Sequence, residues 1–189
     1  MLPSLSDKLG SKLQPLTPVV VAPSLLPARR NVLQELKKVE AIQVSCAGKK
    51  DWLVIEVFVN SATAMTDGEE LMVQDDTRRP TIRIERALLE FTHLRDRVYN
   101  FAHTSHHCNP CEFCLGILDL VVFGANPDGF LIGLLGGKRM TRTLTQFAEA
   151  LLEMTLQHTC ADTRGCCAAQ KSVPQIVHAF FFTPAQVDA

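Results

Sequence analysis

The chain has 189 residues, 47% of them hydrophobic, which is enough for one domain of ordinary size with a sizeable core. Its 19 basic and 20 acidic residues nearly cancel, which excludes a general attraction to nucleic acid or membranes, so an anionic partner would need a local basic cluster. Prolines interrupt the apolar run near residue 20, and the turn sequence at 126–129 interrupts the one near residue 120, so neither a signal peptide nor a transmembrane helix is expected. We therefore expect a cytoplasmic protein whose seven cysteines are thiols or metal ligands rather than disulfides.

The first elements form a tail, a short helix and a hairpin. Residues 1–30 are rich in Pro, Ser and Leu without a sustained period, which predicts a flexible N-terminal tail. Asn31 can cap a short helix that ends at Lys38. Residues 41–46 alternate as a strand, and residues 52–59 are β-branched and aromatic, so with the glycine-containing turn between them they predict an antiparallel hairpin.

The stretch 81–101 changes its hydrophobic period in the middle. Ile82 and Ile84 alternate with polar residues, as in a half-buried strand. From Leu88 onward the apolar residues recur every three or four positions, as on one face of a helix. Only Ala87 separates the two patterns, so we predict a third strand that runs directly into a helix.

Helices follow this corner. The apolar run 115–123 is interpreted as a core helix in preference to a membrane-facing one, and 141–158 has the period of a long helix. Ser172 can cap a last helix with Pro174 in its first turn, before a C-terminal tail at 185–189. Consecutive strands followed by helices predict an α+β fold, in which a three-stranded antiparallel sheet precedes a helical subdomain, over residues 31–184.

Several residues in this order resemble the PX (phox-homology) domain. The corner carries Phe91 with Leu94 three positions later, and the long helix opens with Leu144, Phe147 and Leu151 at the family's spacing. An apolar segment at 176–182 corresponds to the short helix that closes the family domain. The resemblance covers roughly 39–182 and consists mostly of packing residues.

The resemblance implies a phosphoinositide-binding protein, peripheral on endosomal-type membranes, with phosphatidylinositol 3-phosphate as the expected lipid. In the family, arginines hold the phosphates and a tyrosine packs on the inositol, but those positions are Ala87, Leu88 and Met140 here. Neighbouring cations are candidate substitutes, and the alternative is that they are solvated surface residues. The candidate phosphate ligands are Arg86, Lys138, Arg139 and Arg142.

The resemblance also implies a membrane-inserting loop. Apolar residues beside Lys138 and Arg139 would suit a bilayer with anionic head groups, and a core position is an equally good interpretation. The candidate insertion residues are Phe130, Leu131, Ile132, Leu134 and Leu135.

A Cys/His-rich segment follows the corner helix. Cys108, Cys111 and Cys114 have the Cys-x-x-Cys spacing of metal ligands, and His103, His106 and His107 lie close by. We expect a structural zinc site of His107, Cys108, Cys111 and Cys114, with Cys160, Cys166 or Cys167 able to complete a site across the fold. The alternative is that these cysteines are small apolar residues at the start of a buried helix.

No motif for catalysis is present, so an enzyme is not expected. The sequence thus supports a phosphoinositide-binding PX-like domain. The alternative is a PX-like protein-interaction module that binds no lipid and is stabilised by a structural zinc. Nucleic acid is not an expected partner in either case.

Overall fold

The computed structural model describes residues 25–49, 51–60, 79–125, 127, 136–158 and 165–184. Most of the predicted N-terminal tail, the C-terminal tail, the insertion residues at 130–135 and Cys160 lie outside these ranges. The elements, in chain order, are α1 (Leu25–Lys37), β1 (Val39–Cys46), β2 (Trp52–Val59), β3 (Ile82–Ala87), α2 (Leu88–Thr104), α3 (Glu112–Phe123), α5 (Gly137–Gln157) and α6 (Ala168–Phe182).

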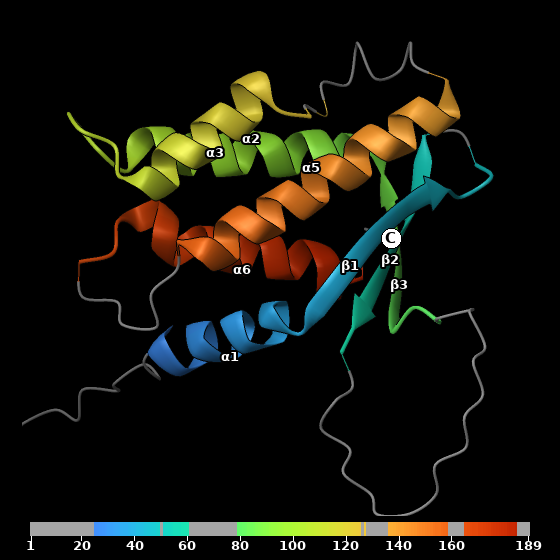
Figure 1. Ribbon diagram of the computed structural model, residues 1–189, viewed down its shortest axis with the longest axis horizontal. Helices are drawn as coiled ribbons and strands as arrows, with labels where there is room; N and C mark the ends of the chain where they lie inside the picture. Colours follow the sequence, from blue (N-terminus) through green and yellow to red (C-terminus); the bar gives the residue numbers. More distant parts are fainter. Residues whose placement is uncertain are drawn as a thin grey trace, which may run out of the picture.

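The strands form one antiparallel sheet in the order β1-β2-β3, beside a layer of helices (Figure 1). This confirms the predicted hairpin and the α+β fold class. Cys46, Leu53 and Arg86 are paired across the three strands at one level of the sheet. Because side chains alternate along a strand, these three residues share the face that also carries buried Ile42, Val44 and Ile55. Ala87 therefore belongs to the opposite face.

The corner between β3 and α2 forms where the sequence predicts it. Ala87 ends the strand with extended backbone and is the N-cap of α2, which begins at Leu88. Alanine has no side-chain oxygen to cap a helix, and Glu90 compensates by accepting the Ala87 N–H at 2.8 Å. Residues 88–101 are helical throughout, as their spacing predicts.

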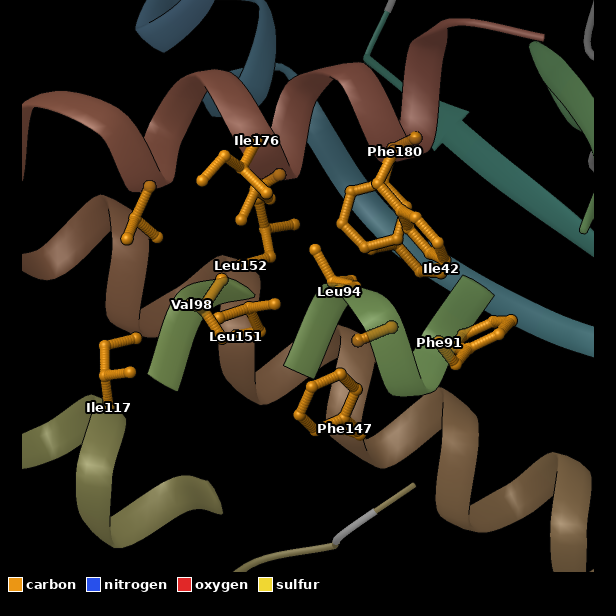
Figure 2. Close-up of a cluster of buried hydrophobic side chains, with 14 of the residues drawn as sticks. Ile42, Phe91, Leu94, Val98, Ile117, Phe147, Leu151, Leu152, Ile176 and Phe180 are labelled. Atoms are coloured by element: carbon orange, nitrogen blue, oxygen red, sulfur yellow. The ribbon is translucent and has the colours of Figure 1, made fainter. Parts of the chain in front are cut away.

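The core lies between the sheet and the helices. Phe91, Leu94 and Val98 form the buried stripe of α2 and belong to one cluster with side chains of α5 and α6 (Figure 2). The Phe91 and Phe180 rings meet edge to face with centroids 4.9 Å apart. The prediction that 115–123 is a core helix is confirmed for Ile117 and Val121, which are buried.

Three helix boundaries differ from the predictions. α1 begins at Leu25 instead of residue 31, α5 begins at Gly137 instead of 141, and α6 begins at Ala168, so that Pro174 lies inside it. Proline has no N–H to donate to the carbonyl of Gln170 four residues earlier. The guanidinium of Arg29 donates to that carbonyl instead, at 3.1 Å, and is itself buried. This contact explains why α1 extends into a segment that is predicted to be a flexible tail.

Candidate functional site

Arg86 is buried, although the resemblance makes it a candidate phosphate ligand. Its guanidinium donates to the carbonyls of Phe180 and Ala179 and makes a short contact with that of Thr183, all at the C-terminal end of α6. It also forms an ion pair with Glu90 at 3.0 Å. A cation there adds a donor to carbonyls at the end of the helix, of which that of Ala179 also accepts the Thr183 N–H, and it complements the helix dipole. Neither interpretation from the sequence, phosphate ligand or solvated surface arginine, describes this environment.

The other candidate cations lie at the far edge of the sheet from Arg86. Gly137, which opens α5, approaches β1 so closely that a Cβ there would lie 3.6 Å from Sγ of Cys46. Cys46 and Arg86 are separated by β2, which places them about 10 Å apart across the sheet at the usual strand spacing. Arg86 lines a cleft with residues of α2 and α6, and neither Lys138 nor Arg139 is among the described residues that line it.

Lys138, Arg139 and Arg142 form what we call the basic turn of α5. All three side chains are exposed, and none forms an ion pair with another described residue. The helix has no acidic residue in its first turn, and no side chain caps it. A cation near the positive end of a helix dipole is unfavourable by about 0.3–1 kcal/mol, so a bound anion would relieve this repulsion.

Exposed apolar side chains gather at the C-terminal end of α3. Phe123 is 83% exposed and Val122 57% exposed. The hydroxyl of Thr92 on α2 donates to the carbonyl of Pro127, just after α3, which brings Leu89 of α2, 60% exposed, toward the same end. The end of α3 and the start of α5 lie on the same side of the molecule (Figure 1). None of the described helices has both the length and the apolar character needed to cross a bilayer.

A second group of side chains joins three helix ends, and we call it the Cys/His cluster. It consists of His106, Cys111, Cys114 and Cys167, whose ligand atoms all lie within 4.8 Å of one another, so the group could hold a metal ion. His106 follows α2, Cys111 is the N-cap of α3, and Cys167 is the N-cap of α6. Close to the cluster, the hydroxyl of Ser105 accepts the Ala169 N–H at 2.8 Å. The cluster therefore lies where the end of α2 meets the starts of α3 and α6.

The spacing of the sulfur atoms suits one tetrahedral ion. Sγ of Cys167 lies 3.6 Å from that of Cys114 and 3.9 Å from that of Cys111. Two sulfurs bound tetrahedrally to zinc at about 2.3 Å are separated by about 3.8 Å. Nε2 of His106 is buried without a hydrogen-bond partner, as expected of a nitrogen that has a metal to bind.

The electrostatics of the cluster favour one thiolate more than another. Burial acts to raise the pKa of Cys111, but hydrogen bonds from the Cys114 backbone and from the Cys114 and Cys167 thiols outweigh it and hold that pKa below its ordinary value. Burial, followed by the influence of Cys167 and Cys111, raises the pKa of Cys114 well above its ordinary value. The metal-free cluster is therefore expected to keep a proton on Cys114 at neutral pH.

This proton makes metal binding dependent on pH. Zinc must displace it, and because the metal-free form then holds more protons, acid favours the metal-free form. We expect the zinc affinity to rise between pH 6 and 8 by about tenfold per pH unit for each displaced proton. A competition titration against a chelating dye at several pH values would measure this, and an affinity independent of pH would contradict it.

Two of the four predicted metal ligands belong to this cluster. Cys111 and Cys114 are members, whereas His107 and Cys108 are exposed and outside it. Their places are taken by His106 and by Cys167, one of the distant cysteines considered from the sequence. The spacing identifies Cys111 and Cys114 because an N-cap and the third residue of a helix face each other. No local pattern distinguishes His106 from His107.

Comparison with known proteins adds no family to this description. No protein-family model, no curated protein and no solved structure matches the chain.

Proposed function

We propose that the chain is a zinc-stabilised, PX-like module that associates peripherally with anionic, phosphoinositide-containing membranes. The observation that carries this proposal is the pairing of two features at one side of the molecule. The strongly exposed Phe123 and Val122 end α3, and the basic turn opens α5 there. Stable peripheral association with a membrane takes two signals of this kind, an apolar contact and an electrostatic one.

The phosphate contact in this proposal belongs to the basic turn alone. Lys138 and Arg142 are four residues apart and so share a helix face beside the uncapped backbone N–H groups of the first turn. Helix N-termini bind phosphate through such groups, and exposed cations add to the attraction. Arg86 is left out because its donors already have partners in α6 and Glu90. The predicted insertion residues at 130–135 remain an expectation, as does an endosomal location.

Zinc is the metal that the Cys/His cluster fits best. Three thiolates and one imidazole are a common ligand set for structural zinc and leave no open position for catalysis. Cys111, Cys114, Cys167 and His106 would hold the ion, which would supply a cross-link between α2, α3 and α6. The remaining helices and the sheet would then present the membrane-facing end in a fixed orientation.

Vesicle co-sedimentation tests the lipid proposal. We expect the protein to bind phosphatidylcholine vesicles that contain phosphatidylserine or phosphatidylinositol 3-phosphate, and to lose affinity as salt rises. At about 1 kcal/mol for each cation near the surface, Lys138→Ala with Arg139→Ala should weaken binding by about 30-fold. Phe123→Ser should reduce the affinity by about tenfold, because it removes an apolar contact.

The control is a pair of exposed lysines that precede β1, whose opposite end, at Cys46, lies near the start of α5. Lys37→Ala with Lys38→Ala removes the same charge from the end of α1, so vesicle binding should change little. Tighter binding to phosphatidylinositol 3-phosphate than to phosphatidylserine at equal surface charge would support recognition of the head group. Equal sedimentation of wild type and the Lys138/Arg139 variant would overturn the assignment of the basic turn.

A second candidate function is favoured by one observation, the burial of Arg86. Without an arginine in the family's lipid pocket, the fold could act as a protein-interaction module. The exposed apolar residues at the end of α3 would then contact a protein partner. Absence of sedimentation with every anionic vesicle, by a protein shown to be folded, would favour this candidate over the lipid proposal.

A further inference from the structure

In the Cys/His cluster one sulfur lies close to the two others, and two of the three cysteines are partly exposed. Cys167 is the shared neighbour, 3.9 Å from Cys111 and 3.6 Å from Cys114. A disulfide needs the two sulfurs at about 2.05 Å, so a side-chain movement of about 2 Å would join Cys167 to either partner. The cluster thus has the geometry of a metal site and also that of a dithiol.

Access distinguishes the two partners of Cys167. Cys114 is fully buried, whereas Cys111 and Cys167 are partly exposed. Cys111 also lines a cleft of about 660 Å³ between the start of α3 and the end of α5, together with Pro110, Leu115 and His158. A small molecule from solvent can therefore reach Cys111 without opening the core.

We propose that Cys111 and Cys167 form a peroxide-sensitive disulfide site, in which oxidation expels the zinc ion. This inference rests on the proposed zinc site and adds a modification to it. The oxidant class is a hydroperoxide small enough to enter the cleft, for which hydrogen peroxide is the probe.

The chemistry balances with that single oxidant. The Cys111 thiolate attacks one peroxide oxygen, the O–O bond breaks, hydroxide leaves, and the sulfur becomes a sulfenic acid. The Cys167 thiolate then attacks that sulfur, the S–S bond forms, and a second hydroxide leaves. The two thiolates have lost two electrons, the peroxide has gained them, and two protons from solvent convert the hydroxides to water. Only His106 and Cys114 remain as ligands, too few to hold zinc in a closed structural site.

Two cysteines outside the Cys/His cluster provide controls. Cys108 lies between His106 and Cys111 in the chain but is exposed and not a member of the cluster, and Cys46 lies on β1 next to Gly137. A protein with both replaced by serine should keep its zinc and respond to peroxide like the wild type. Cys167→Ser removes the resolving sulfur and should form no intramolecular disulfide under the same treatment.

The test begins with elemental analysis of the purified protein, followed by hydrogen peroxide titration with a zinc-responsive dye and intact mass measurement. We expect one zinc released for each disulfide formed, a mass loss of two hydrogen atoms, a Cys111–Cys167 peptide, and recovery with a dithiol and zinc. Protein isolated without zinc would refute the zinc site, whether or not a disulfide forms. Zinc-loaded protein that retains its metal under peroxide, or releases it through another cysteine pair or an overoxidised thiol, would overturn this inference while leaving the zinc site intact.

Discussion

Replacing Arg86 with alanine is expected to lower the free energy of unfolding by about 3–5 kcal/mol, the range found when one partner of a buried ion pair is removed. The guanidinium satisfies carbonyls of Ala179 and Phe180 at the end of α6 and neutralises Glu90. Without it, the Phe180 carbonyl loses its side-chain donor in a poorly solvated place, and the Glu90 carboxylate loses its cation. At about 2–4 °C per kcal/mol for a chain of this size, the melting temperature should fall by about 10 °C.

Arg83→Ala is the matched control for this prediction. Arg83 lies on the same strand but on the opposite face, where its side chain is 68% exposed and 4.0 Å from Glu56. Exposed pairs of this kind contribute about 0–1 kcal/mol, so the control should melt within a few degrees of the wild type. Thermal denaturation followed by circular dichroism would measure both. If the two variants were equally stable, Arg86 would not be the residue that holds the end of α6 against the sheet.

Removal of zinc is expected to have the second large effect. Free zinc at about 1,000 times its dissociation constant adds about 4.1 kcal/mol to the stability of a folded protein that binds it. A chelator should therefore lower the melting temperature by about 8–16 °C. The loss should be greatest where the cluster joins the end of α2 to the starts of α3 and α6.

Two cysteine variants, one inside and one outside the Cys/His cluster, provide the matched comparison for zinc removal. Cys114→Ser deletes a buried ligand and should make the melting temperature insensitive to the chelator, whereas Cys108→Ser should leave the sensitivity unchanged. Differential scanning fluorimetry with and without chelator would compare the two. Equal responses of both variants would show that Cys114 is not a ligand.

Local periodicity was sufficient to predict the elements that depend on near neighbours. The change of period at Ala87 locates the strand-to-helix corner, and the β-branched run of β2 gives that strand at its observed bounds, Trp52–Val59. The sequence also contains a signal for the start of α6. Cys167 and Gln170 have the spacing of a capping box, in which each side chain bonds the other's backbone N–H. Cysteine is an unusual N-cap, however, and Ser172 is of the residue type that N-caps favour.

The environment of the candidate site residues could not be predicted, because it depends on distant segments. Arg86 contacts carbonyls more than ninety residues away in the chain, and Arg29 contacts a carbonyl left free by Pro174. The fourth ligand in the Cys/His cluster comes from Cys167, more than fifty residues after Cys111. Nothing in the local pattern around these residues specifies which distant partner they meet.

Hydrogen exchange with and without vesicles is the most direct measurement of how this protein meets a membrane. With zinc-loaded protein and phosphoinositide-containing vesicles, we predict slower exchange at the end of α3, near Val122 and Phe123, and in the first turn of α5 around Lys138. Exchange in the groove between α2 and α6 that Arg86 lines should not change. Slower exchange confined to that groove, or no change anywhere under conditions where the protein sediments with vesicles, would contradict the assignment of this end as the membrane-binding surface.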